Sequence, residues 1–371
     1  MIYRGIIACL CLVTAVFAAD SVSSGGVEGS WNPKTVAAYL DGRIDWWMHW
    51  PGAARDHETF CVSCHTAVAY MLARPSLRAA GSKPSLGESR CLQNVAKRVH
   101  LRKEVQPFYG GANAGPSRGT EAVLNALILC NSDHASGQLS DDTRAAFSNM
   151  WSSQLTTGNS KGAWEWIQFN NEPWEAQDSQ YYGAALAALA VGSAPGNYRS
   201  APEIRIRAEW LREYLGRDFA KQSPANQAVV LWASADWPGL LSPRQRSALI
   251  DDLIKKQQPD GGWSLASLVW TWRDWSLKSL AKLYGRSEAT PLNPKSDGYA
   301  TGLITLALER SGISPTEAHL ENARAWLVHN QRLDGRWPAY SLNGKRDHSY
   351  GEGLFMDDAA TAYAVLALTV H

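Results

Sequence analysis

The stretch Asp357-Asp358-Ala359-Ala360-Thr361-Ala362-Tyr363-Ala364-Val365-Leu366-Ala367-Leu368 decides the fold, because it is one of six similar phrases in a chain of 371 residues. Each phrase has a polar start followed by small and apolar residues, the composition of a helix buried on every side. The other copies begin at Cys64, Arg118, Asp178, Asn226 and Asp297. Their mean spacing of about 59 residues fits one helical hairpin with a long loop.

More polar, amphipathic stretches lie between the six phrases. They span residues 33–48, 88–102, 140–155, 203–219, 243–257 and 316–330. Alternating amphipathic and fully apolar helices build a double ring with the apolar set inside, so the sequence predicts an all-α fold, an (α/α)6 toroid. Residues 20–371 would form it as one domain. The stretch 269–285 breaks the period and is either an inserted helix or a long loop.

The inner helices of such a ring all run the same way, so their N-terminal turns meet at one end. Free N–H groups and positive dipole ends collect there, and we expect the chemistry at this mouth. The loop 164–175, rich in Trp and Glu, is either a packed lid or a grip on a sugar or an apolar polycycle. The predicted substrate cavity is lined by Glu121, Trp166, Trp174, Asp178, Tyr181 and Asp297.

The N-terminus predicts export. Residues 1–19 combine one basic residue, a short apolar stretch and a small-residue end, which is typical of a secretory signal. Cys9 gives a lipobox-like alternative very near the start. The net charge is +1 with the basic residues spread along the chain, which does not favour nucleic-acid binding, and no later segment is long and apolar enough to span a bilayer. A periplasmic or secreted protein is therefore expected.

Cys61-Val62-Ser63-Cys64-His65 is the most specific motif in the chain. In an exported protein, Cys-x-x-Cys-His indicates c-type haem attachment through two thioethers, with the adjacent histidine as proximal iron ligand. The distal ligand would come from Met48, His49 or His57, or the sixth position would stay open. Two alternatives remain: a zinc site completed by Asp56, His57 or water, and a plain disulfide.

The other two cysteines of the mature chain favour a disulfide. Cys91 lies near the start of an outer helix, and Cys130 lies near the end of the inner helix that returns beside it. An antiparallel hairpin would bring both to the same end, so a Cys91–Cys130 bond is predicted.

Two phrases at the ends of outer helices carry a family resemblance. They are Gln257-Gln258-Pro259-Asp260-Gly261-Gly262-Trp263 and Asn330-Gln331-Arg332-Leu333-Asp334-Gly335-Arg336-Trp337, with a weaker relative at 158–164. They resemble the Gln/Trp (QW) repeat of squalene-hopene cyclases and the related loops of prenyltransferase β-subunits. The likeness implies the terpenoid-cyclase and prenyltransferase toroid fold. It says little about the reaction, because the motif's role is structural.

A second likeness concerns Phe355-Met356-Asp357-Asp358-Ala359. It resembles the Asp-x-Asp-Asp-Thr-Ala acid motif of class II terpene cyclases, which implies Asp357 as proton donor and Asp358 as its neighbour. Phe355 stands where the motif has its first Asp, and Ala359 where it has Thr. The competing interpretation is that both acids cap a helix N-terminus.

The leading functional hypothesis is an exported toroid with a haem c site that handles a hydrophobic, isoprenoid-like molecule. Three rivals stand beside it: an acid-catalysed terpene cyclase using Asp357, a non-enzymatic electron-transfer or scaffold protein with a redox partner, and a carbohydrate-active toroid. The terpene cyclase would not need the thiols, whereas the electron-transfer or scaffold protein would need haem but no ligand in the cavity.

Overall fold

The computed structural model describes residues 30–269, 288–290 and 293–370, and the structural statements below concern these parts of the chain. They are mainly helical, with one two-stranded hairpin, which confirms the all-α class. None of the described helices combines the length and apolarity needed to cross a bilayer. The predicted signal at 1–19 and nearly all of the period-breaking stretch at 269–285 lie outside the described residues.

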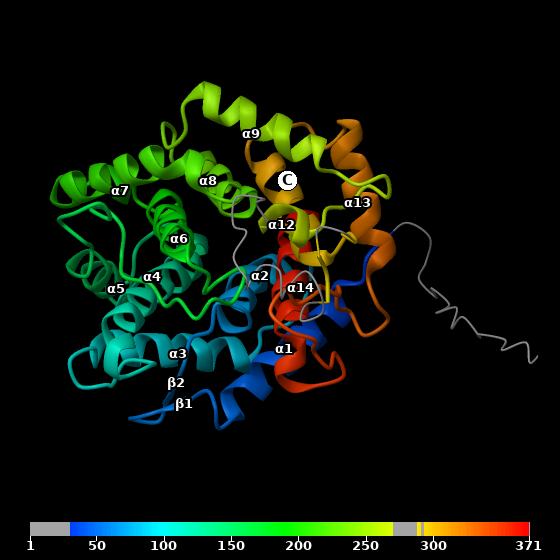
Figure 1. The fold of residues 1–371 in the computed structure, drawn as a ribbon. Coiled ribbons are helices and arrows are strands. Elements are labelled where there is room, and N and C mark those ends of the chain that lie inside the picture. The colour runs from blue at the N-terminus through cyan, green and yellow to red at the C-terminus, as the bar shows by residue number, and fades with distance from the viewer. Residues whose placement is uncertain (1–29, 270–287, 291–292, 371) are drawn as a thin grey trace, which may run out of the picture.

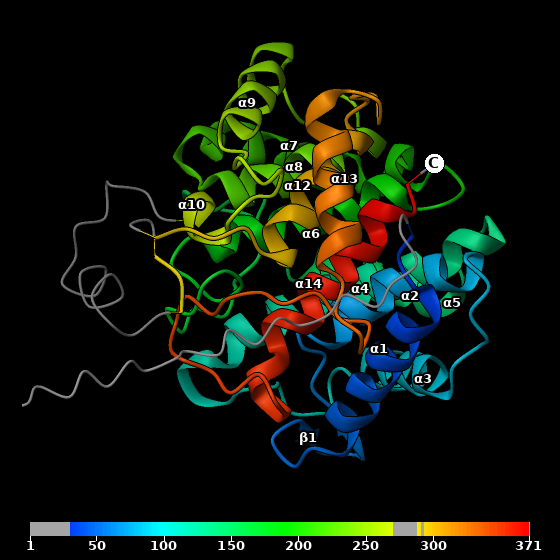
Figure 2. The same ribbon diagram turned by 90° about the vertical axis from the view of Figure 1, so that its right-hand side faces the viewer.

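The six apolar phrases form the inner wall. Their helices are α2 (Ala67–Ala79), α4 (Ala114–Asp133), α6 (Ser179–Ser193), α8 (Pro224–Asp236), α12 (Gly298–Arg310) and α14 (Phe355–Leu368). Each of these packs against the next, and α14 returns to α2, so the described inner helices close a ring. Figure 1 shows them surrounded by a rim of outer helices, and Figure 2 gives the perpendicular view.

The amphipathic stretches form that rim. The outer helices are α1 (Pro33–His49), α3 (Leu86–His100), α5 (Asp141–Ser152), α7 (Arg205–Asp218), α9 (Pro243–Lys255) and α13 (Ala318–Asn330), and the short α10 spans Leu265–Val269. Single 3-10 turns lie at Gly111–Asn113, His134–Ser136, Tyr198–Ser200, Pro202–Ile204, Phe219–Lys221 and Gly351–Leu354.

Three equivalent turns each connect the end of one outer helix to the next, from α5 to α7, from α9 to α13 and from α13 to α1. Gly162, Gly261 and Gly335 all have positive φ. A Cβ at Gly261 or Gly335 would lie within 3 Å of the backbone of α13 or α1, so no larger residue fits there. The same turns are tied by glutamines: Gln154, Gln257 and Gln331 donate to carbonyls of α7, α13 and the residue before α1. The last contact joins the end of α13 to the residue before α1 and so connects the last outer helix to the first.

A hairpin not predicted from the sequence positions the cysteine motif. Strand β1 (Ala54–Arg55) pairs antiparallel with β2 (Thr59–Phe60). Its turn places His57 and Glu58 at positive φ, a conformation usually taken by Gly or Asn, and so it gave no turn signal. The hairpin delivers Cys61 to the end of α1, where the indole N–H of Trp47 donates to the Cys61 carbonyl at 2.7 Å.

Candidate functional site

Cys61, Cys64 and His65 line one small cavity at the N-terminal end of α2. Its volume is about 40 Å³. The walls also include Trp47, Phe108, Tyr109, Trp166, Ile167 and Glu175. Both thiols are free. Burial raises the pKa of the Cys61 thiol to about 12 and that of Cys64 well above its usual range, so both are protonated in this state.

The imidazole of His65 is packed among aromatic rings. It stacks on Phe355 with centroids 3.7 Å apart, and Trp47 and Trp174 flank it at 5.1 and 5.7 Å. Burial lowers the pKa of His65 to about 3, because the apolar surroundings disfavour a charged ring. His65 is therefore neutral near pH 7. Phe355, the residue that departs from the acid motif, is the one that packs on this ring.

A hydrogen-bond chain joins His65 to Asp358. His65 Nδ1 lies 2.9 Å from Thr66 Oγ1, and Thr66 Oγ1 donates to Asp358 Oδ2 at 2.6 Å. With its own proton given to the carboxylate, the Thr66 hydroxyl has lone pairs free to accept from an Nδ1–H of His65. His65 Nε2 has no hydrogen-bond partner among the described residues.

Asp358 is buried and held by three side chains, Tyr39 and Arg43 of α1 and Thr66 at the start of α2. Arg43 on α1 binds it with Nε to Oδ1 at 2.7 Å and Nη2 to Oδ2 at 3.0 Å, and the Tyr39 hydroxyl donates to Oδ1 at 2.8 Å. Burial raises the pKa of Asp358, and Arg43 opposes that rise. His65 of the cysteine motif is therefore joined to Asp358 through Thr66.

Asp357 has different hydrogen-bond partners from Asp358. It accepts from the Ala339 backbone N–H at 2.9 Å, and its Oδ2 lies 3.2 Å from both Arg336 and His348. His348 also contacts Glu288 at 3.0 Å. These hydrogen bonds to two carboxylates, Asp357 first, raise the pKa of His348 to about 10. The role of Asp357 as proton donor stays a prediction.

The predicted cavity residues are only partly brought together. Trp166 and Trp174 are buried near His65, and the Trp166 indole donates to the Trp174 carbonyl at 2.9 Å. Glu121 pairs with Arg98 of α3 at 2.6 Å. The Tyr181 hydroxyl donates to Leu215 of the outer helix α7, away from the ring centre.

Asp178 and Asp297 are the residues that directly precede the inner helices α6 and α12. Asp178 accepts from Asn226 at 3.0 Å. Asp297 caps α12 by accepting from the Ala300 N–H and also accepts from the Leu265 N–H. Burial raises the pKa of Asp297 to about 7.

None of the predicted distal ligands lines the cavity with His65. His49 is exposed and contacts Asp45. His57 is partly exposed in the hairpin turn beside Asp56. Met48 is half-buried on α1. In this arrangement the chain supplies one imidazole to the site and no second ligand from the three candidates.

Two cysteine predictions need correction. Cys91 and Cys130 are free thiols, so the predicted disulfide is wrong for this structure. Cys130 is turned toward α6, where its thiol contacts the Ala190 carbonyl at 3.2 Å. The zinc alternative is also unsupported, because no three Cys, His, Asp or Glu side chains in the described ranges converge into a metal cage. Asp56 is already engaged by the Gln106 N–H.

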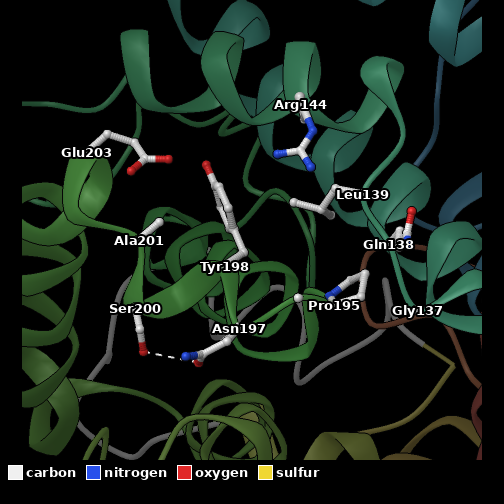
Figure 3. Close-up of a pocket in the computed structure, with 11 residues that line it drawn as sticks. Gly137, Gln138, Leu139, Arg144, Pro195, Asn197, Tyr198, Ser200, Ala201 and Glu203 are labelled. Carbon is white, nitrogen blue, oxygen red and sulfur yellow. Dashed lines mark hydrogen bonds between the residues drawn. The ribbon is translucent and has the colours of Figure 1, made fainter.

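A larger cavity, of about 320 Å³, lies between the α4–α5 and α6–α7 connections, at the C-terminal ends of α4 and α6. Figure 3 shows Arg144 and Glu203 on either side of Tyr198 there. The Tyr198 hydroxyl accepts from the Trp151 indole at 2.9 Å. No residue predicted for the site lines this cavity, which opens at the end of the ring opposite the inner N-termini.

Sequence reasoning missed four residues of the His65 site. Thr66, Arg43, Tyr39 and Phe355 were not named as site residues, although Thr66 directly follows the motif. Phe355 carried a signal, since a large aromatic replaces an expected acid. Arg43 and Tyr39 gave none, because their partner is more than 300 positions away.

Comparisons with known proteins give a structural likeness but no sequence match. No family model matches the chain, and no curated protein matches it. Among solved structures, the chain is similar to the apo type II terpene cyclase MstE from Scytonema, at 14% sequence identity and a TM-score of 0.43. The match covers 91% of this chain and 98% of that one.

Proposed function

We propose that Cys61 and Cys64 attach a c-type haem covalently and that His65 Nε2 is its proximal iron ligand. The observation that carries the proposal is the donor set around one cavity: two free thiols and a neutral imidazole whose Nε2 lone pair is available. In the attachment, each S–H adds across one vinyl group of the porphyrin. The sulfur bonds to one vinyl carbon and the hydrogen to the other, so no external oxidant is needed.

The residues fit haem at its attachment points but do not enclose it. The cavity of about 40 Å³ has room for only a few water molecules, far less than ligand pockets of about 300–1,000 Å³. Its outer wall includes Tyr109 and Glu175, which are partly exposed. Loading therefore requires this wall to open, and a rigid wall would prevent attachment.

The chain's own residues prepare His65 for this role. Phe355, Trp47 and Trp174 pack around the ring, and this apolar environment keeps the imidazole neutral. Thr66 Oγ1 contacts Nδ1, so Nε2 is the ring nitrogen left to bind iron. A bound haem would supply one-electron redox chemistry. The proposed setting is an exported protein that handles a hydrophobic, isoprenoid-like molecule or exchanges electrons with a partner protein.

The test is haem incorporation. The full chain is produced in a host with a cytochrome c maturation system, and covalent haem is measured by pyridine haemochrome absorption and intact mass. We expect stoichiometric haem in the wild type and in Cys91→Ser, the matched control for loss of a buried thiol. Cys61→Ser/Cys64→Ser should lose all covalent haem. Absence of haem from the wild type would remove the proposal.

A second candidate is acid-catalysed cyclisation of an isoprenoid with Asp357 as proton donor. It is favoured by a cluster of buried aromatic rings, in which Tyr299 of α12 lies 5.0 Å from Tyr363 of α14 and 5.8 Å from Trp174. Such π faces stabilise cations. Product analysis with squalene and shorter polyprenyl substrates tests it. Loss of turnover in Asp357→Asn with full activity in Cys64→Ser would establish this candidate over the first.

A further inference from the structure

Thr66 stands at the N-cap of α2 but does not cap it. Ser and Thr at this position normally accept from the N–H groups of the first turn. Here the Thr66 side chain makes no capping hydrogen bond. Ser63 does that work instead, since its Oγ accepts from the N–H groups of Thr66 and Ala67 at 3.2 and 3.0 Å. The Thr66 hydroxyl is thereby left to His65 and Asp358 alone.

Asp358 occupies a position where the preceding repeat has glycine. Asp297 caps α12 and Asp357 lies in the first turn of α14, but both accept from the backbone N–H two residues after the loop tryptophan, so Gly298 corresponds to Asp358. A carboxylate at this position is therefore not required to build an inner helix. Asp358 is only 1% exposed, and an unpaired charge there would be costly. Arg43 supplies the compensating charge through two hydrogen bonds.

We propose that Thr66 and Asp358, held by Arg43, form a positioning chain that fixes the His65 proton on Nδ1 and sets how strongly Nε2 donates electrons. The first half of this statement concerns the apoprotein. The second half rests on the haem proposal above. A carboxylate at the far end of the chain polarises the Nδ1–H bond and makes Nε2 a stronger donor, as outer hydrogen-bond partners of metal-binding histidines generally do.

The variant that isolates the chain is Thr66→Val, which keeps the side-chain shape and removes the hydroxyl. Thr66→Ser is the rescue variant, because it restores the hydroxyl. Thr305→Val is the matched control. Thr305 is buried on the inner helix α12, and its hydroxyl has no hydrogen-bond partner among the described residues.

The first readout needs no haem. Histidine ring ¹⁵N spectra of the apoprotein, assigned with His65→Gln, report which ring nitrogen carries the proton. The wild type, Thr66→Ser and Thr305→Val should show His65 as the Nδ1–H tautomer. Thr66→Val should lower the Nδ1–H to Nε2–H ratio at least tenfold. An unchanged ratio in Thr66→Val, or an Nε2–H wild type, would overturn the proposal.

The second readout is the iron midpoint potential of haem-loaded protein, measured with redox mediators. Weaker donation from His65 destabilises ferric iron relative to ferrous iron, so the potential should rise in Thr66→Val. A tenfold change in the one-electron equilibrium corresponds to about 59 mV. The potential should return in Thr66→Ser and stay unchanged in Thr305→Val. A Thr66→Val potential equal to that of the wild type would overturn the tuning role while leaving haem attachment intact. If no haem attaches, the haem proposal fails, and the ¹⁵N readout still decides the tautomer.

Discussion

The described parts of two consecutive repeats, 257–301 and 331–361, share the same hydrogen bonds around a tryptophan but differ in the residues around the aspartate that begins the inner helix. In each, a buried tryptophan donates its indole N–H to the preceding outer helix, Trp263 to Leu253 and Trp337 to Leu327, both at 2.7 Å. In each, an aspartate at the start of the next inner helix accepts a hydrogen bond from the backbone N–H two residues after the tryptophan. Asp297 and Asp357 are therefore the same structural device in consecutive repeats.

The difference lies in what surrounds that device. Asp357 gains Arg336 and His348, whereas the position of Arg336 is occupied by Gly262 in the earlier repeat. Asp358 follows it, where the earlier repeat has Gly298. The shared contact indicates that Asp357 anchors the loop before α14, as Asp297 does before α12. Asp358, the residue joined to His65, has no acidic counterpart in the earlier repeat.

The largest expected effect tests the equivalence itself. Trp263→Ala and Trp337→Ala should each cost about 3–5 kcal/mol in the free energy of unfolding, because both side chains are fully buried. The two costs should agree within about 1 kcal/mol. Trp210→Ala is the control and should cost much less, since Trp210 is half-buried. Chemical denaturation measures all three, and Phe variants replace Ala where a protein fails to fold. Unequal costs would break the comparison.

The next effect separates the two aspartates. Asp357→Asn should destabilise the protein by about 2–3 kcal/mol, because Arg336 and His348 lose a charged hydrogen-bond partner. Asp297→Asn should cost less, about 1–2 kcal/mol near pH 6, because it loses no charged partner but its amide nitrogen cannot accept from one of the two backbone N–H groups that the carboxyl group binds. Burial raises the pKa of Asp297 to about 7, so an uncharged side chain is tolerated there. Equal losses in denaturant midpoints would contradict the assignment.

A smaller effect concerns Gly298. A Cβ at this position would lie 2.6 Å from the Trp337 Cβ and 3.2 Å from the Ala360 Cβ. Gly298→Ala should therefore cost about 1–2 kcal/mol, since overpacking outweighs the gain in helix propensity. Gly216→Ala, on the open face of α7, should be neutral or stabilising because nothing lies within 4 Å of its Cβ. A stabilised Gly298→Ala protein would contradict this reason for glycine.

The helices were predictable because their signal is local. Residues 243–257 and 297–308 were expected as helices, and α9 and α12 span Pro243–Lys255 and Gly298–Arg310. When a helix is apolar on every face, its sequence does not show which face points to which neighbour. The sequence therefore could not predict that Cys130 faces α6.

The site was predictable only in part. The placement of the motif at the ring mouth followed from the repeat. The Arg43–Asp358 pair and the stacking of Phe355 on His65 depend on ring closure between segments about 300 residues apart, which no local pattern encodes.

The smallest expected effect is a pH dependence that arises from His348 in the last repeat. His348 lies between Asp357 and Glu288, and these partners raise its pKa to about 10. Glu288 also accepts from the Ser341 and Arg346 N–H groups. The folded pKa exceeds the unfolded value, so the stabilisation is fully present below about pH 6.5 and is lost as the pH rises through about 10. His348→Gln should lower the melting temperature by about 2 °C at pH 6, corresponding to about 1 kcal/mol after solvent screening. The two proteins should converge near pH 10. A constant gap across this range would mean that the imidazole is uncharged in the folded protein, and the last repeat would then differ from its neighbour in packing rather than in charge.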